Sequence, residues 1–195
     1  MSINQSCVFC DNNNNANFLF SARDYNRKIS EVDFEYYICK KCNHIFLKSI
    51  PDDLSRYYDN FFNFPSMSKL NFITKKESFK IEMMSKYLSI GDKICEIGPS
   101  IGIFLFNVKK KGYIATGLEM SGDCCNFIRD KLDINAIETV NPSDEIKKIP
   151  YQHAFTFWHS LEHIPNPKQL LQTCIERLEK NGIVVIVCWP ISNTS

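Results

Sequence analysis

The chain has 195 residues, 44% of them hydrophobic, which is enough for one well-packed core and a small additional module. Its 23 basic and 22 acidic side chains leave a formal net charge of +1, so no overall field attracts nucleic acid or an anionic membrane surface. Residues 1–5 lack the basic stretch of a secretion signal, and no uncharged apolar run approaches about 18 residues. These features predict a soluble cytoplasmic protein without membrane segments.

Near the amino terminus, four of the nine cysteines form two C-x-x-C pairs, Cys7 with Cys10 and Cys39 with Cys42. In a reducing compartment such pairs favour metal ligands over structural disulfides. Four thiolates complete a tetrahedral zinc site and leave no position open for water or substrate. The doubled motif therefore predicts a structural zinc ion, with a redox pair or chance clustering as the alternative.

The segments around these pairs fit a small zinc-ribbon-like module. Asp11 and Asn43 each follow the second cysteine of a pair, where a metal-binding turn favours a residue that tolerates positive φ. Residues 17–20 and 34–38 have strand composition and connect the two turns. With the aromatic linker that ends near Pro65, the module is expected to cover residues 1–65.

The remaining residues, 66–195, alternate between helix and strand patterns. A first helix is expected to pack Phe79, Met83, Met84, Tyr87 and Leu88 against a sheet. The following elements are strands at 93–97, 113–119, 134–137, 154–158 and 183–189, and helices at 102–111, 121–132 and 166–182, with a polar loop before the fourth strand. The last strand is expected to be buried on both faces. This alternation predicts an α/β, Rossmann-like domain with a mainly parallel sheet and helices on both faces.

The turn after the strand at 93–97 has the features of a cofactor site. Gly98 and Gly102 supply small residues where the backbone approaches a ligand and opens the next helix. Glu119 ends the next strand roughly 20 residues later, where a carboxylate can accept from two ribose hydroxyls. Strand, turn, helix and acidic residue together predict a nucleotide-type cofactor, the alternative being a structural turn without a ligand.

Glu96, which ends the strand beside this turn, indicates which cofactor is bound. A dinucleotide would place its pyrophosphate here, and two negative charges would repel. A ligand with a sulfonium and an ammonium group and no phosphate is favoured instead. S-adenosylmethionine has these groups. The predicted cofactor-binding residues are Glu96, Gly98, Pro99, Ser100, Gly102, Glu119, Met120 and Trp158.

The paired C-x-x-C motifs, the segments 94–102 and 117–121, and the run Trp158 to Pro167 resemble the class I S-adenosylmethionine-dependent methyltransferases. The similar group is the bacterial one with an amino-terminal four-cysteine zinc module. The resemblance covers nearly the whole chain and implies a sugar, nucleotide-sugar or polysaccharide precursor as the acceptor. Ser100 replaces the middle glycine of the family turn, which a serine with negative φ could accommodate, and His153 replaces the acidic residue usual before the fourth strand.

The resemblance also implies two further strands after residue 195, so the sheet is expected to lack its last strands. Either the chain is truncated, or an oligomer or another partner covers the exposed sheet edge.

Methyl transfer from a sulfonium is an in-line displacement that needs a base when the acceptor is a hydroxyl or a carbon acid. His159 is the predicted base, because it follows the fourth strand at the ligand-binding edge and histidine exchanges protons near neutral pH. Packing or helix capping is the alternative role for His159. Glu162 and His163 are expected to order the loop and the cofactor pocket.

Two other functions compete with this one. A zinc-ribbon binding protein on a degenerate or truncated Rossmann core would not be catalytic, and both Ser100 and the expected truncation favour it. An RNA methyltransferase would need a basic face on the zinc module, but residues 1–60 are slightly acidic. Nucleic acid is therefore not an expected partner, and a small-molecule or carbohydrate substrate is.

Overall fold

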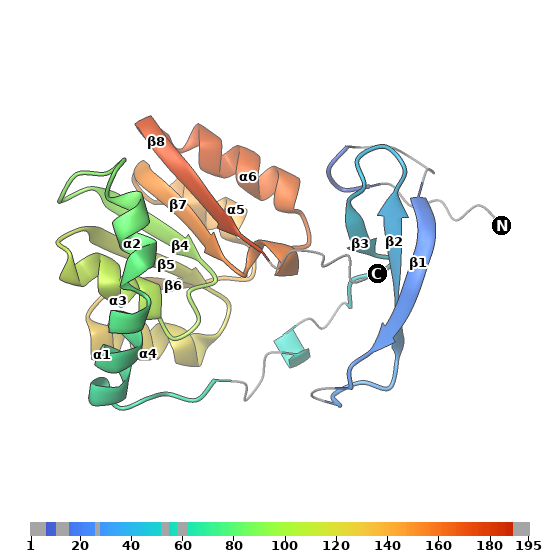
Figure 1. Cartoon of the computed structure of the whole chain (residues 1–195), viewed down its shortest axis with the longest axis horizontal. Helices are drawn as coiled ribbons and strands as arrows, with labels where there is room; N and C mark the ends of the chain where they lie inside the picture. The colour runs from blue at the N-terminus through green and yellow to red at the C-terminus, as the bar shows by residue number, and fades with distance from the viewer. Residues whose placement is uncertain (1–6, 11–15, 26–27, 52–54, 58–61, 189–195) are drawn as a thin grey trace. The chain divides into compact units, whose positions relative to one another are not determined.

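The computed structural model describes residues 7–10, 16–25, 28–51, 55–57 and 62–188. The chain divides into two compact units (Figure 1). One comprises Met1–Asp59 with Pro165–Lys168, and the other comprises Asn60–Ile164 with Gln169–Ser195. No helix among the described residues is both long enough and apolar enough to cross a bilayer.

The first unit contains a three-stranded antiparallel sheet in the order β1-β2-β3. Its strands are β1 (Ala16–Arg23), β2 (Asp33–Cys39) and β3 (Ile45–Leu47), and a short 3-10 helix η1 (Ser55–Tyr57) follows. The strands predicted at 17–20 and 34–38 are confirmed as parts of β1 and β2. Asn43 has the expected positive φ of 58°, whereas Asp11 lies outside the described residues.

The second unit contains a five-stranded parallel sheet in the order β6-β5-β4-β7-β8. The strands are β4 (Lys93–Ile97), β5 (Ile114–Glu119), β6 (Asn135–Glu138), β7 (Gln152–Trp158) and β8 (Leu178–Val187). The helices are α1 (Met67–Lys76), α2 (Ser78–Met84), α3 (Ile103–Lys110), α4 (Gly122–Leu132), α5 (Pro142–Lys148) and α6 (Pro167–Glu176), with the 3-10 helix η2 (Leu161–His163) after β7. The predicted α/β class with helices on both faces is confirmed.

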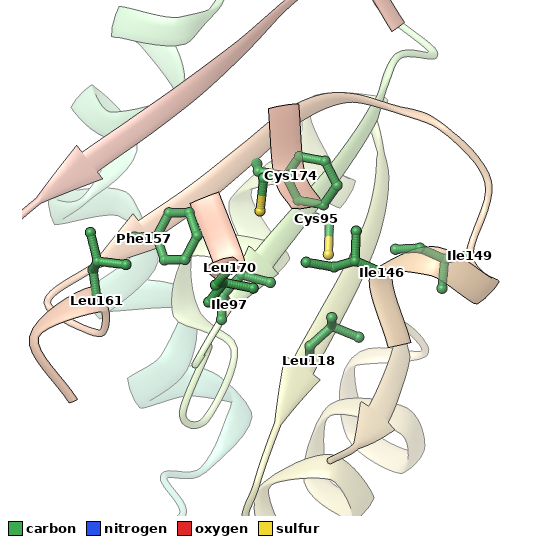
Figure 2. Packing of buried hydrophobic residues seen from close by; sticks show 10 residues of the cluster. Cys95, Ile97, Leu118, Ile146, Ile149, Phe157, Leu161, Leu170 and Cys174 are labelled. Atoms are coloured by element: carbon green, nitrogen blue, oxygen red, sulfur yellow. The ribbon is translucent and has the colours of Figure 1, made fainter. Parts of the chain in front are cut away.

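The alternation of side chains along β4 and β7 divides the core into two layers. Cys95, Ile97, Phe155 and Phe157 face α5 and α6, where they pack with residues such as Leu170 (Figure 2). Ile94 and Ala154 face the opposite side and pack against Ile81 and Met84 of α2. Glu96, Thr156 and Trp158 lie on this second face too, because side chains two residues apart on a strand point to the same side. The apolar layer that packs against α2 therefore ends in polar groups at the carboxyl ends of β4 and β7.

The predicted stripe on the first helix is confirmed for Met84, which is buried, and for Leu88, which packs against the same core cluster. It is wrong for Phe79, Met83 and Tyr87, which are 59%, 46% and 68% exposed, and it omitted Ile81, which is buried. The helix is also interrupted at Glu77, so α1 and α2 present separate faces to the core. The apolar residues at Phe79 and Met83 therefore belong to the solvent side of α2.

Three further features of the second unit differ from the predictions: the loop before β7, the end of α6 and the burial of β8. The polar loop before β7 contains α5, which Pro142 opens at its first position. Helix α6 ends at Glu176 rather than at residue 182, because Gln152 N already donates to Arg177 O at 3.0 Å and starts the pairing with β7. The positive φ of Asn181, 65°, falls where the β7–β8 register shifts. Strand β8 is half-exposed rather than buried on both faces, because it is the edge of the described sheet.

Candidate cofactor site and cysteine cluster

The turn that joins β4 to α3 needs glycine at both ends. Gly98 has a φ of 70°, and a Cβ there would lie 2.8 Å from the Cβ of Ser160. Gly102 has a φ of 77°, and a Cβ would meet Ile128 at 2.9 Å. Glycine is thus required by the conformation and by close packing on β7's loop and on α4. The conformation of the turn therefore follows from packing within the protein and does not depend on a bound ligand.

Ser100 contradicts the expectation of a negative φ. Its φ is 55°, in the left-handed region that costs a non-glycine residue about 1–2 kcal/mol. The conformation is held by Glu119, whose Oε2 accepts from Ser100 N at 2.8 Å. The replaced glycine of the turn therefore keeps a glycine-like backbone.

Glu119 lies at the end of β5 as predicted, but its carboxylate is already hydrogen-bonded. Besides Ser100 N, it accepts at Oε1 from Met120 N at 2.8 Å and from Ser121 N at 3.0 Å. A carboxylate has about four acceptor positions, so about one remains for a ligand hydroxyl. Glu119 ties the glycine turn of β4 to the start of α4.

Glu96 is the buried acidic group of the site. It is 3% exposed, and its Oε2 has no hydrogen-bond partner among the residues that the structure describes. Burial raises the pKa of the Glu96 carboxyl to about 8, although the positive charge of Lys80 lowers it. A buried acceptor without a partner is costly to the fold, and such groups concentrate at functional sites.

The loop after β7 supplies the other side of the site. Trp158 packs its ring 5.2 Å from that of Phe104, and its buried Nε1 finds no hydrogen-bond partner within the described part of the chain. His159 has a φ of 56°, and its backbone N donates to Val187 O at 2.7 Å. Its Nδ1 lies 3.9 Å from Glu162 Oε1, and its side chain is 40% exposed. A positive φ at histidine is uncommon and occurs often at ligand sites.

The four cysteines of the two C-x-x-C pairs lie together in the first unit. Cys7 Sγ is 3.6 Å from Cys42 Sγ, Cys10 Sγ is 3.5 Å from Cys39 Sγ, and all four sulfurs lie within 4.8 Å of one another. Sulfurs about 2.3 Å from a tetrahedral zinc ion are about 3.8 Å apart. A backbone hydrogen bond from Cys42 is the main reason that the pKa of the Cys39 thiol is lowered to about 6, against the effect of burial. The geometry suits a four-thiolate metal ion.

A family model described as a methyltransferase domain matches residues 67–192, which is more than half of the chain. The chain belongs to this methyltransferase-domain family. The matched region holds the glycine turn, Glu96, Glu119, Trp158 and His159, and it does not include the cysteine pairs.

Several curated relatives of this methyltransferase-domain chain carry the name ubiquinone biosynthesis O-methyltransferase, and two of them show the extent of the similarity. The one from Glaesserella parasuis serovar 5 (strain SH0165) is 27% identical over 105 residues, 49% of this chain and 44% of the relative. The one from Aliivibrio fischeri (strain MJ11) is 23% identical over 147 residues, 71% of this chain and 59% of the relative. The chain spans about half the length of these relatives.

The fold is also found in the crystal structure of Streptomyces venezuelae DesVI, with a TM-score of 0.51 and 16% identity. The similarity covers 68% of this chain and 61% of that one. At 16% identity, this similarity shows a shared Rossmann-like fold and nothing about function.

The structure brings the predicted cofactor residues of β4, its turn, β5 and β7 to one edge of the sheet. Sequence reasoning missed Lys80 and Glu77, which lie beside Trp158 and Glu96, because residues around Phe79 were assigned to a core stripe. It also missed Ser160, whose Oγ donates to Ile97 O at 2.6 Å beside Gly98. The i,i+3 spacing of the opposite charges Glu77 and Lys80 is the sequence signal that could have identified this pair.

Proposed function

We propose that the chain is an S-adenosylmethionine-dependent methyltransferase. The observation that carries the proposal is Glu96, a buried carboxyl with an unpartnered oxygen at the end of the strand that enters the glycine turn. A sulfonium and an ammonium group supply positive charge to such a site, whereas a phosphate would add negative charge. Membership in the methyltransferase-domain family supports the same assignment.

Bound S-adenosylmethionine supplies the methyl group on its sulfonium, and the residues of the chain bind and orient it. Glu96 faces the ammonium group, and Glu119 accepts from the ribose through the acceptor position that its backbone bonds leave. The turn residues allow the backbone to approach closely, and Met120 and Trp158 flank the ligand. The proposed binding residues are Glu96, Gly98, Pro99, Ser100, Gly102, Glu119, Met120 and Trp158.

His159 is the proposed general base. It follows β7 at the carboxyl ends of the strands, the edge at which open α/β sheets bind ligands. When the acceptor is a hydroxyl, the imidazole takes its proton, and the Glu162 carboxylate at 3.9 Å stabilises the resulting imidazolium. We expect His159→Asn to lower the rate of methyl transfer by roughly 100-fold or more without weakening cofactor binding.

The proposed metal of the first unit is a structural zinc ion held by Cys7, Cys10, Cys39 and Cys42. The sulfur spacing supports it, and four thiolates leave no position for a substrate or a catalytic water. We expect native mass spectrometry to find one zinc ion per chain and Cys39→Ser to lack it. A metal-free protein with an intact first unit would contradict the assignment.

The proposed acceptor is a sugar, a nucleotide-linked sugar or a polysaccharide precursor. This rests on the similarity of the cysteine pairs and of the run Trp158 to Pro167 to methyltransferases that act on such compounds. The curated relatives carry a different substrate in their names, at 27% and 23% identity over part of their length. Methyl transfer to a panel of nucleotide-linked sugars tests the acceptor, and activity confined to the acceptors of those relatives would contradict it.

Isothermal titration with S-adenosylhomocysteine tests the cofactor assignment. We expect binding by the wild-type chain and a loss of roughly 10–100-fold in affinity for Glu96→Gln, because a charge-assisted hydrogen bond is removed. Glu82→Gln, an exposed carboxylate on α2, is the matched control and should bind as the wild type does. Absence of binding by the folded wild-type chain would instead favour a non-catalytic zinc-ribbon binding protein.

A further inference from the structure

Ser160 lies directly after His159, in the loop that leads from β7 to η2. The residue is buried, and its Oγ donates to Ile97 O at 2.6 Å. Ile97 is the last residue of β4, the strand that enters the glycine turn. Loss of a buried hydrogen bond of this kind is costly, because the carbonyl is left without its donor. The loop after β7 is therefore attached to the end of β4.

The same side chain packs against the glycine turn of the proposed cofactor site. A Cβ on Gly98 would lie 2.8 Å from Ser160 Cβ and 3.5 Å from its Oγ, so only glycine allows this approach. Ser160 is thus held by a hydrogen bond to β4 and by a close contact with the residue that follows β4. Its position is fixed relative to the turn, and the backbone of the neighbouring His159 is restrained with it.

His159 has a backbone conformation that needs such restraints. Its φ of 56° is in the left-handed region, which is unfavourable for a residue with a Cβ. Unfavourable conformations of this kind persist where surrounding contacts hold them, and they are frequent at active sites. His159 N donates to Val187 O of β8 at 2.7 Å, and Ser160 Oγ bonds to β4. Because β7 lies between β4 and β8 in the sheet, the loop is held by both neighbouring strands.

We propose that Ser160 is a positioning residue for His159, and that its hydroxyl keeps the histidine at the carboxyl edge of the sheet next to the glycine turn. A general base works only within hydrogen-bond reach of the proton that it removes, and a displacement of about 1 Å lowers the rate strongly. Ser160 acts without touching the substrate, because its hydroxyl donates to the protein backbone. The inference rests on the proposed function, since it assigns a supporting residue to the proposed base.

The first test compares kcat with KM, using S-adenosylmethionine and the panel of nucleotide-linked sugars. We expect Ser160→Ala to lower kcat by roughly 10-fold and to leave the KM for S-adenosylmethionine within about twofold, because the base and not the cofactor is displaced. Ser160→Cys keeps a side chain of similar shape with a weaker donor and should lose less. Thr173→Val is the matched control and should retain the wild-type kcat, because it removes a buried hydroxyl that donates to Gln169 O at 3.0 Å on α6. A rise in KM at unchanged kcat in Ser160→Ala would contradict the inference.

A double-substitution cycle shows whether Ser160 acts through His159. In the His159→Asn background, we expect Ser160→Ala to change the rate of methyl transfer by less than about twofold, because no base remains to be positioned. The same loss of roughly 10-fold in both backgrounds would show that Ser160 acts independently of His159, and it would overturn the inference.

Hydrogen exchange tests the restraint without any acceptor. We expect Ser160→Ala to speed the exchange of the His159 amide, which bonds to Val187 O, by roughly 10-fold while the amides of β4 stay protected. Ser160→Cys should show a smaller increase, and it replaces Ser160→Ala in both tests if that variant does not fold. Unchanged exchange at His159 would overturn the inference and leave the proposed function standing. Faster exchange at an unchanged kcat would also overturn it, because the conformation of the loop would not matter for catalysis. Failure of the folded wild-type chain to bind S-adenosylhomocysteine would overturn the proposed function instead.

Discussion

The two units of the chain bury their side chains to different extents. In the described part of the first unit, the buried hydrophobic side chains are Cys7, Tyr37 and Cys39, and two of these belong to the cysteine cluster. Phe18, Leu19 and Phe20 on β1 are exposed. The described part of the second unit buries three clusters of aliphatic and aromatic side chains around its sheet.

This difference indicates that the units are stabilised by different interactions. A small sheet with so few buried apolar residues does not gain enough from burial to balance its chain entropy, and small domains of this kind usually depend on a metal or on disulfides. The Rossmann-like unit buries large aliphatic and aromatic side chains on its sheet, so we expect it to be stable without a metal. We therefore expect the cysteine cluster to determine the stability of the first unit and to leave the stability of the second unit unchanged.

Removal of the proposed metal ligands is the most direct test of this difference in stabilisation between the two units. We expect Cys39→Ser, or a zinc chelator, to unfold the first unit, because structural zinc contributes about 10–16 kcal/mol in small zinc modules. Hydrogen exchange should show loss of protection in β2 and unchanged protection in β4 and β7. Cys188→Ser, which removes an exposed cysteine outside the cluster, is the control. Persistent protection of β2 under the chelator would show that the metal is not needed.

The reciprocal prediction concerns Phe157, which is fully buried between β7 and the helices α5 and α6 (Figure 2). We expect Phe157→Ala to lower the free energy of unfolding of the second unit by about 3–5 kcal/mol, because a large cavity remains. Urea unfolding measures this loss, and the zinc content of the first unit should not change. Ile186→Ala, at a residue that is 44% exposed on β8, should cost about 1 kcal/mol or less. A similar cost at both positions would contradict the location of the core.

The pH dependence of stability distinguishes the units further, because the second one contains Glu96. Burial raises its pKa from 4.5 to about 8, so the folded chain keeps a proton that the unfolded chain releases between these values. Stability should therefore fall as pH rises through this window, by at most about 1.4 kcal/mol per pH unit, and level off above it. Urea midpoints of the second unit between pH 5 and 8 measure the slope.

Glu96→Gln should flatten that slope, and Glu82→Gln should leave it as in the wild type. Binding of a cationic ligand should also release the proton from Glu96, which titration in buffers of different ionisation enthalpy would detect. A flat profile for the wild-type chain would show that Glu96 is ionised despite its burial.

The sequence predicted the sheet and the cysteine pairs well because both leave local signals. The boundaries of β4 are as predicted, since five residues between charged neighbours and glycines allow little else. The helix predicted to begin at residue 121 is α4, and Ser121 caps it with its Oγ accepting from Cys124 N at 3.3 Å. These features depend on spacing within a few residues.

The wrong predictions concern features that depend on contacts between residues far apart in the sequence. Whether the side chains of Phe79 and Met83 are exposed depends on which side of α2 packs on the sheet. The sequence does not show this, because both sides of that helix carry apolar residues. The end of α6 depends on the pairing of Arg177 O with Gln152 N, which no local pattern reveals. The acceptor capacity of Glu119 depends on Ser100 N from another strand's turn. Residues that meet only in the folded chain could not be predicted from spacing.

Ser100 gives the smallest expected effect, and it concerns backbone strain within the second unit. Its φ of 55° is unfavourable for serine, so Ser100→Gly should raise the stability of the second unit by a few tenths to about 1 kcal/mol. The gain is limited because glycine also increases the entropy of the unfolded chain. Ser85→Gly is the matched control, because Ser85 has an ordinary φ of −59° and should be destabilised by about 0.5–1 kcal/mol. Both substitutions remove the same side chain from the same unit, and the opposite backbone conformations set the opposite signs. Ser85→Gly also removes the hydrogen bond that Ser85 Oγ donates to Glu82 O at 2.7 Å, which adds to its cost. Equal signs in thermal unfolding would mean that the bond from Ser100 N to Glu119 does not hold a strained turn in solution.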